Sequence, residues 1–292
     1  MAEKDNLRRF LFEELAIRGE WVNLTQSWQQ AKQHHQYPLV ASQQLGQAMV
    51  ATVLLTAIMK FKGSMILQIQ GDGDIRTLVA QCTDERHIRG LVRCQDELTA
   101  GSLSHLFGQG HLVLTIQTEK AEPYQGVVGL DGHNIAEALE GYFTQSEQLK
   151  TRLWLFANET EAVGLFLQEL PSKAEEGSQQ EDWQRIEALA NTVTETELMQ
   201  LSCEDMLYRL FNEEKVRVFD AESVVFKCGC SNEKIENTLY SLGRKELTHI
   251  LEEQDEIKVD CEYCDQDYRY DRIDVEKLLN KNTDSPISTT RH

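Results

Sequence analysis

The chain is short of positive charge, and this deficit limits the partners it can bind. Lysine and arginine total 29 against 48 aspartate and glutamate, which gives a formal net charge of −19. A field of this sign repels nucleic acid and anionic membranes. The deficit extends to residues 229–292, where nine basic side chains stand against fifteen acidic ones. The sequence therefore disfavours a nucleic-acid or membrane partner.

Targeting and membrane-spanning signals are also missing. The first six residues carry acids where a signal peptide would have a basic cluster, and no apolar core follows them. The most apolar run, residues 45–59, contains Gly46, Gln47, Thr52 and Thr56. It is shorter than the ~20 residues that cross a bilayer. We expect a cytoplasmic protein in which this run forms a buried or amphipathic helix.

Motifs for nucleotide binding and for metal-dependent catalysis are missing as well. No G-x-x-x-x-G-K-[ST] loop occurs, and Gly71-Asp72-Gly73-Asp74 is an acidic turn unsuited to phosphate. No His-Glu-x-x-His occurs, and no G-x-S-x-G accompanies the histidines. We therefore expect neither ATP binding nor an enzymatic activity.

Cysteine is scarce, but four of the seven cysteines form two close pairs. Cys228 and Cys230 make a C-x-C pair, and Cys261 and Cys264 make a C-x-x-C pair thirty residues later. Two close thiolate pairs joined by a small intervening fold complete a tetrahedral site, which favours zinc. Four protein thiolates leave no open position for water, so the sequence predicts a structural rather than a catalytic ion.

The same four sulfurs leave other states open. Each pair is short enough to close as a local disulfide, so the site could hold metal when reduced and lose it when oxidised. A static zinc site and two ordinary structural disulfides are the simpler alternatives. The other three cysteines, Cys82, Cys94 and Cys203, are not arranged in close pairs along the sequence. This argues against a secreted protein held together by disulfides. Structural zinc contributes roughly 10–16 kcal/mol, so its loss would unfold a module of this size.

Two further classes of protein compete with a redox switch. A dithiol-disulfide oxidoreductase would use Cys261 and Cys264, but the acidic Asp265 and Asp267 that follow oppose thiolate formation without metal. A zinc-ribbon binding module in transcription or translation would need a basic face, which the acidic C-terminal segment lacks.

Hydrophobic periodicity predicts an α+β class, with a sheet-rich N-terminal domain and covering helices. Residues 10–24 look strand-like, Pro38 opens a long helix that reaches Ile58, and another helix spans about 134–148. Residues 64–70 and 75–80 flank the Gly-Asp turn as a hairpin. Further strands are expected at 87–93, 111–118, 125–130, 151–157 and 162–170.

A polar, charged stretch at 171–182 predicts a linker, followed by helices at 183–192 and 195–211. Thr194 and Glu197 have the spacing of a capping box at the start of the second helix. These helices offer little core of their own, so their stability must come from a neighbour. Residues 216–226 look strand-like.

The metal module is predicted to contain helices at 232–242 and 245–252 separated by Gly243, a strand at 257–259 and a last helix at 274–279. The predicted domains are an α+β core at 1–171, a metastable helical linker at 172–226, a small zinc-binding redox-switch domain at 227–281 and a disordered tail at 282–292.

The chain resembles the 33 kDa heat-shock protein family, redox-regulated cytoplasmic chaperones of bacteria, over nearly its whole length. The paired cysteine pattern is the most specific landmark. The other landmarks are Arg18-Gly19, Lys60-Phe61-Lys62-Gly63, Leu67-Gln68-Ile69-Gln70-Gly71-Asp72-Gly73, Tyr124-Gln125-Gly126-Val127-Val128, Tyr142-Phe143 and Ser146-Glu147-Gln148.

The resemblance implies a redox-regulated, ATP-independent holdase. It implies that Cys228, Cys230, Cys261 and Cys264 bind one zinc ion in the reduced, inactive protein. It further implies that oxidation joins Cys228 to Cys230 and Cys261 to Cys264, releases zinc, unfolds the C-terminal module and loosens the linker. The protein would then dimerise and hold unfolding client proteins, with Cys82, Cys94 and Cys203 as incidental thiols.

Overall fold

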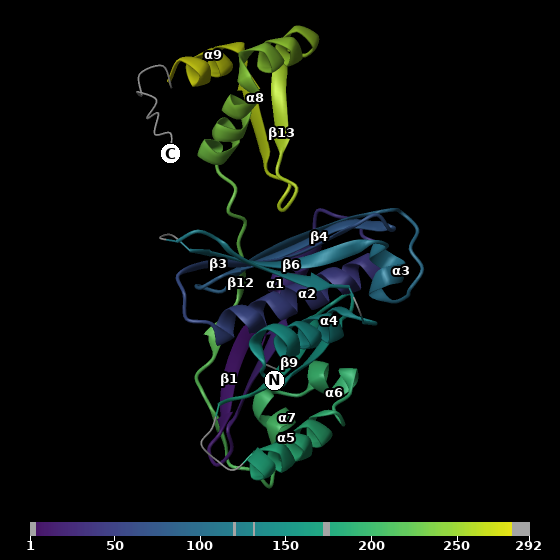
Figure 1. Ribbon diagram of the computed structural model, residues 1–292. Coiled ribbons are helices and arrows are strands. Elements are labelled where there is room, and N and C mark those ends of the chain that lie inside the picture. Colours follow the sequence, from purple (N-terminus) through teal and green to yellow (C-terminus); the bar gives the residue numbers. More distant parts are fainter. Residues whose placement is uncertain (1–3, 119–120, 131, 172–175, 282–292) are drawn as a thin grey trace. The chain divides into compact units, whose positions relative to one another are not determined.

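A computed structural model describes residues 4–118, 121–130, 132–171 and 176–281 of the chain (Figure 1). The chain divides into two compact units, residues 1–227 and residues 228–292. Both units mix helices with antiparallel strands, so the predicted α+β class is confirmed. The predicted disordered tail lies outside the described residues.

The first sheet of the N-terminal unit has the strand order β10-β1-β2-β9-β8, with β11 also paired to β1. Its strands are β1 (Asn6–Phe12), β2 (Ile17–Leu24), β8 (Thr151–Ala157), β9 (Ala162–Glu169), β10 (Val216–Val218) and β11 (Glu222–Ser223). The strand-like segment predicted from Phe10 is two strands of a hairpin. Gly19 lies opposite Phe10, whose ring occupies the space that a Cβ would need.

The second sheet has the order β12-β5-β4-β3-β6-β7. Its strands are β3 (Gly63–Gly71), β4 (Ile75–Thr83), β5 (His87–Cys94), β6 (Gly110–Thr118), β7 (Tyr124–Gly129) and β12 (Val225–Phe226). β3 and β4 pair as the predicted hairpin, with Ile69 opposite Leu78. Asp72 shapes the turn, because its carboxylate accepts a 2.7 Å hydrogen bond from the Gln109 backbone N–H.

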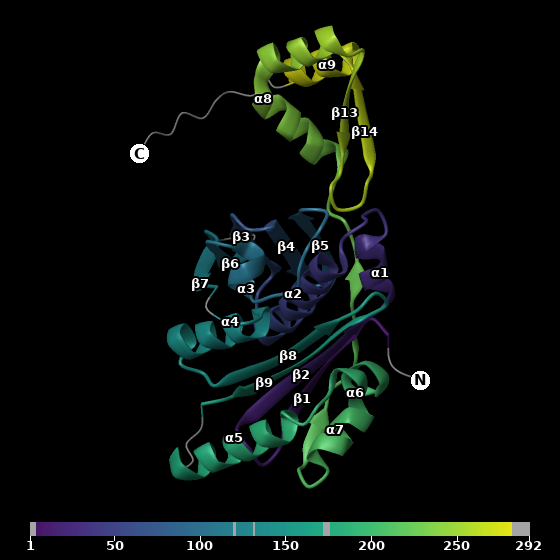
Figure 2. The same ribbon diagram turned by 90° about the vertical axis from the view of Figure 1, so that its right-hand side faces the viewer.

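Helix α2 (Leu39–Ile58) lies between the two sheets, as Figure 2 shows. Pro38 precedes its first residue, which confirms the predicted start. The helix is long and apolar enough to cross a membrane by length and composition, but 72% of its most apolar window is buried inside the protein. Residues such as Leu45, Met49 and Leu54 pack against both sheets. It is therefore the central core helix.

Shorter helices complete the N-terminal unit. They are α1 (Gln26–Lys32), α3 (Leu103–Phe107), α4 (Ile135–Tyr142) and the π-helix η1 (Phe143–Glu147). The predicted helix at 134–148 is therefore correct in extent, but its last turn is widened to π geometry. Gln148 ends it in the left-handed region at φ 55°.

Helices α5 (Glu176–Ala190), α6 (Glu195–Gln200) and α7 (Cys203–Phe211) cover the face of the first sheet that points away from α2 (Figure 2). The expected start at 183 is wrong, because α5 begins at Glu176. Residues 177–182 are polar and none of them is buried, so no apolar periodicity reveals this part of the helix in the sequence.

The expectation of one helix over 195–211 is also wrong. The capping box of Thr194 and Glu197 is present, but Leu201 is extended and Ser202 caps a new helix. The Ser202 hydroxyl accepts a hydrogen bond from the Asp205 N–H at 3.1 Å. This second cap signal divides the segment into α6 and α7.

The C-terminal unit contains α8 (Asn232–Glu253), β13 (Glu256–Asp260), β14 (Asp267–Asp271) and α9 (Arg272–Lys281). Gly243 breaks α8 with φ 82° and ψ 162°, which confirms the predicted stop. β14 was not predicted; it pairs with β13 in a hairpin whose turn carries the second cysteine pair. The unit has its own small core of Leu239, Leu247, Leu251, Ile257, Tyr270, Val275 and Leu278.

Candidate metal centre

The four cysteines of the two motifs come together at one end of the C-terminal unit. Cys228 and Cys230 lie in the segment that leads into α8, directly before its capping residue Ser231. Cys261 and Cys264 lie in the turn between β13 and β14. All four are free thiols and half-buried. The fold of this unit therefore brings together two motifs that are thirty residues apart.

The sulfur geometry suits one shared ion. Cys228 Sγ lies 3.5 Å from Cys261 Sγ, and Cys230 Sγ lies 3.5 Å from Cys264 Sγ. All four sulfurs lie within 4.8 Å of one another. An ion with metal–sulfur bonds of about 2.3 Å holds tetrahedral sulfurs about 3.8 Å apart. The cluster could thus hold a metal ion with little movement.

Backbone hydrogen bonds fix the second motif. The Cys264 and Asp265 N–H groups donate to the Cys261 carbonyl at 3.2 and 2.8 Å, and the Cys261 N–H donates to the Gln266 carbonyl at 3.0 Å. Asp265 turns the chain in the left-handed region at φ 55°. On the other motif, the Lys234 Nζ donates to the Gly229 carbonyl at 2.5 Å. Both cysteine pairs are therefore held in place by their own loops.

The electrostatics of the cluster favour a bound cation. Burial raises the pKa of the Cys228 and Cys264 thiols. Burial acts the same way on Cys230, but hydrogen bonds from the Tyr268 hydroxyl and the neighbouring thiols outweigh it and lower its pKa to about 7. Four thiolates this close repel one another strongly. A divalent cation would compensate that charge.

The remaining cysteines lie away from this cluster. Cys82 and Cys203 are fully buried in the two apolar cores of the N-terminal unit. Burial raises the pKa of the Cys82 thiol to about 12, and it also raises the pKa of the half-buried Cys94. Thiols with such raised pKa values are poor nucleophiles and poor metal ligands at neutral pH.

Sequence reasoning missed the two side chains that support the cluster, Lys234 and Tyr268. Lys234 lies in the first turn of α8, so its amine can reach back to the C-x-C loop. Tyr268 lies on β14, and its hydroxyl contacts the Cys230 thiol. In the sequence, Tyr268 stands four residues after Cys264, which is the signal that could have indicated a role near the cluster. The strand β14 that carries Tyr268 was not predicted, so its contact with Cys230 was missed.

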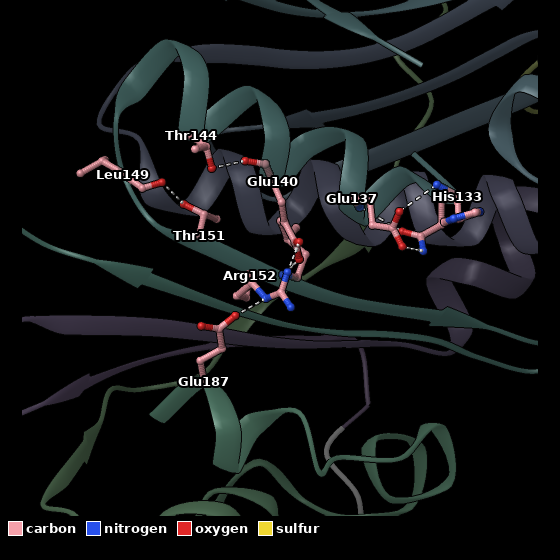
Figure 3. A network of polar contacts seen from close by, with 10 residues as sticks. His133, Glu137, Glu140, Thr144, Leu149, Thr151, Arg152 and Glu187 are labelled. Carbon is pink, nitrogen blue, oxygen red and sulfur yellow. Dashed lines mark hydrogen bonds and ion pairs between the residues drawn. The ribbon is translucent and has the colours of Figure 1, made fainter. Parts of the chain in front are cut away.

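A second polar feature attaches the first linker helix to the core. Arg152 on β8 hydrogen-bonds Glu140 of α4 at 2.6 Å and forms an ion pair with Glu187 of α5 at 2.8 Å (Figure 3). Glu140 also accepts the Leu153 N–H at 2.8 Å, and its burial raises its pKa. Glu140 therefore occupies the open edge of β8, while Arg152 connects that edge to α5.

Apolar packing forms the larger part of the contact between the linker helices and the core. Trp183, Ile186, Leu198, Met206 and Phe211 are at most 4% exposed. They pack on the sheet side chains Phe10, Phe12, Ile17, Trp21, Val163, Leu165 and Leu167. The first sheet therefore supplies the neighbouring surface that the sequence led us to expect for these helices, and their dependence on it for stability stays a prediction.

Comparisons with known proteins match the whole chain. The sequence model of the family described as Hsp33 protein matches residues 5–271. A 33 kDa chaperonin of Nitrosococcus oceani is 54% identical over 292 residues, covering all of both chains. One of Shewanella sediminis is 44% identical over 284 residues, covering 97% of this chain and 98% of its own. The crystal structure of a Thermotoga maritima 33 kDa chaperonin superposes with TM-score 0.83 at 27% identity, covering 96% of this chain and all of that one.

Proposed function

The chain belongs to the Hsp33 protein family, and on that premise we propose that it is a redox-regulated, ATP-independent chaperone that holds unfolding proteins under oxidative stress. The observation that carries the proposal is the cluster of four half-buried thiols within 4.8 Å of one another. The names of the relatives support a chaperone, and the cluster supplies a chemical sensor for its regulation.

The reduced protein is proposed to bind one zinc ion through Cys228, Cys230, Cys261 and Cys264. The donor set fits, because four cysteine sulfurs within 4.8 Å of one another are a donor set that structural zinc sites use. When bound, zinc cross-links the two halves of the module and neutralises thiolate charge. Four protein donors leave no position for a reacting water, which favours a role without enzymatic turnover.

Oxidation is proposed to join Cys228 to Cys230 and Cys261 to Cys264. Each disulfide forms one S–S bond with loss of two protons and two electrons, and hydrogen peroxide takes these up to become two water molecules. The sulfurs then approach to about 2.05 Å. A disulfide sulfur is no longer a thiolate donor, so the ligand set is lost and zinc is released. Two such short loops cannot replace the lost cross-link.

The chain connection offers a route from the cluster to the linker. The Lys227 N–H donates to the Ile88 carbonyl at 3.0 Å, and Cys228 is the next residue. Unfolding of the C-terminal unit would therefore act on β12 and on the segment that leads back to α7. If helices α5 to α7 separate from the first sheet, the apolar side chains of the helices and those of the sheet become exposed. We propose these surfaces as the client-binding region.

The remaining expectations follow from this cycle. The proposed partners are unfolded or partly unfolded client proteins. The oxidised, active form is proposed to be a homodimer. Neither nucleic acid nor a membrane is proposed as a partner. We propose a cytoplasmic location, because thiols stay reduced there until stress. The alternative of an oxidoreductase is disfavoured, since Cys261 and Cys264 lie in a turn between strands and not at a helix N-terminus.

Three measurements on one sample test the proposal. Zinc, free thiols and aggregation of a heat-unfolding client are measured before and after treatment with peroxide and mild heat. We expect zinc release and loss of four thiols to coincide with suppression of client aggregation. The reduced protein, incubated at the same temperature without peroxide, is the control. Retention of zinc after oxidation, or zinc release with no effect on the client, would contradict the proposal.

A further inference from the structure

A cavity of about 180 Å³ lies between the two sheets of the N-terminal unit, beside the end of α2. Its inner wall consists of the buried apolar side chains Leu55, Met65, Leu114 and Phe143. Exposed side chains, including Met59 and Tyr124, line its rim. The cavity therefore leads from solvent into the core. Neither the linker helices nor the cysteine cluster contributes to its lining.

Arg18 gives this cavity a cationic wall. Its Nε and Nη2 donate to the side-chain oxygen of the buried Gln168 at 3.2 and 2.5 Å, and its Nη1 donates to the Ile58 carbonyl at 3.4 Å. All these acceptors are neutral. Within the described part of the chain, no carboxylate forms an ion pair with Arg18. Burial lowers the pKa of its guanidinium, and the charge of the nearby Glu20 offsets this effect only in part.

The nearby acidic groups compensate the charge of Arg18 only in part. Glu20, two residues further along β2, is 2% exposed and its Oε2 has no hydrogen-bond partner. Burial raises the pKa of Glu20 to about 8, so it is mostly protonated at neutral pH. Glu147 lies at the exposed rim and interacts with the Tyr142 hydroxyl. Solvent screens its charge.

The backbone around the cavity is also unusual. Tyr142, Phe143 and Glu147 line it from the end of α4 and the π-helix η1. π-Helical turns are rare and occur mostly at functional sites. A regular α-helix would place these side chains differently around the cavity mouth. The π-turn is thus an observation independent of Arg18 that points to the same site.

We propose that this cavity binds a small apolar carboxylate, with the carboxylate on Arg18 and the tail against Leu55, Met65 and Leu114. An anionic head supplies the charge that Arg18 lacks, and a guanidinium binds carboxylates through paired hydrogen bonds. The volume corresponds to about six water molecules at ~30 Å³ each, which limits the tail to a short chain. An apolar cavity with few polar groups is the usual form of a ligand site.

Binding of sodium hexanoate and hexan-1-ol to the full-length, reduced, zinc-loaded protein tests this proposal. Methyl NMR shifts of Met65 and Leu114 report on occupancy. We expect hexanoate to bind about tenfold or more tightly than hexanol, the ratio that one charge-assisted hydrogen bond supplies. Equal affinity for the two ligands, or shifts confined to residues outside the cavity, would overturn the proposal.

Variants separate the charge from the cavity. Arg18→Gln is expected to lower hexanoate affinity to that of hexanol, with hexanol binding unchanged as proof of an intact cavity. Arg76→Gln, which alters an exposed arginine on β4, should keep the wild-type ratio. If Arg18→Gln also abolishes hexanol binding, the variant Ile116→Trp tests the site instead. It fills the cavity beside an intact Arg18 and should abolish hexanoate binding, and retained binding would refute the site. None of these outcomes depends on the proposed chaperone function.

Discussion

At the scale of single residues, two environments shift the pKa values of the groups that they contain. The four clustered thiols of the C-terminal unit lie within 4.8 Å of one another and need a cation to ionise together. Glu20 of the N-terminal unit is instead buried in the layer between the two sheets. Arg9, Arg18 and Arg86 favour its charged form, but burial outweighs them. The first environment could hold a cation, and the second favours a protonated carboxyl group.

Replacing one thiol should abolish the metal site. In Cys264→Ser we expect zinc affinity to fall by at least about 100-fold, because a hydroxyl does not replace a thiolate ligand. The metal content of the reduced protein and hydrogen exchange over residues 228–281 measure the effect. Cys94→Ser, which alters a half-buried thiol outside the cluster, is the matched control and should bind one zinc. A Cys264→Ser protein that keeps both zinc and slow exchange would contradict the assignment.

Glu20 should make the N-terminal unit less stable as pH rises. Its folded pKa of about 8 exceeds the ordinary 4.5, so between these values the folded state binds more protons than the unfolded state. Its contribution to the free energy of unfolding is complete below about pH 4.5. Between pH 4.5 and pH 8 this contribution falls by up to about 1.4 kcal/mol per pH unit.

Glu20→Gln removes this titration. The free energy of unfolding of the variant, minus that of the wild type, should therefore increase by about 2 kcal/mol between pH 5.5 and 7.5. Urea unfolding at the two pH values, monitored by tryptophan fluorescence, measures the difference. A difference that stays constant with pH would show that Glu20 does not hold its proton in the folded state.

At the scale of elements, the linker helices combine a strong apolar contact with weak polar ones. Ile186 of α5 is fully buried against the first sheet, whereas Arg152 and Glu187 remain about a third and a quarter exposed. Partly exposed ion pairs contribute at most about 1 kcal/mol, while a buried isoleucine contributes 2–5 kcal/mol over alanine. The apolar face therefore determines how firmly α5 binds the sheet.

Ile186→Ala is expected to weaken this contact by about 2–5 kcal/mol and to raise chaperone activity before oxidation. Hydrogen exchange of residues 176–190 and suppression of client aggregation by the reduced protein are the measurements. Leu189→Ala, on the same helix but 37% exposed, should change both far less. Faster exchange in α5 without any gain in activity would separate linker release from client binding and contradict the proposed mechanism.

At the scale of the whole molecule, the two units differ in what stabilises them. The N-terminal unit has two extensive apolar cores on either side of its first sheet. The described core of the C-terminal unit consists of seven buried residues. A core of that size is marginal without a further cross-link. The metal site would supply it, at roughly 10–16 kcal/mol.

Chelation of zinc from the reduced protein should therefore unfold one unit only. We expect residues 228–281 to lose protection from hydrogen exchange while the core strands β3, β4 and β6 keep theirs. Restoring zinc should reverse the change, because no covalent bond has formed. Simultaneous loss of protection in both units would show that they are not independent, and no loss in either would show that the metal does not stabilise the fold.

Some boundaries of helices and strands were predictable from the sequence, and others were not. The α2 start at Pro38, the β3–β4 hairpin and the break at Gly243 depend on turn and cap chemistry within a few residues, and all are confirmed. The start of α5 at Glu176 was missed because its first turns have no apolar stripe. The break at Ser202 was missed because a second cap lay inside an apolar pattern that continues through it.

The sequence by itself determined the set of four paired cysteines, the α+β class, the negative net charge and the family, because each depends on residue identity and short spacing. Only the tertiary structure decided what pairs across long distances. It placed Tyr268 beside Cys230, bound α5 to the first sheet, and placed Arg18 at a cavity without an ion pair to a described carboxylate. Such contacts depend on which faces the packed layers present to one another, and burial then sets the charge that each group can carry.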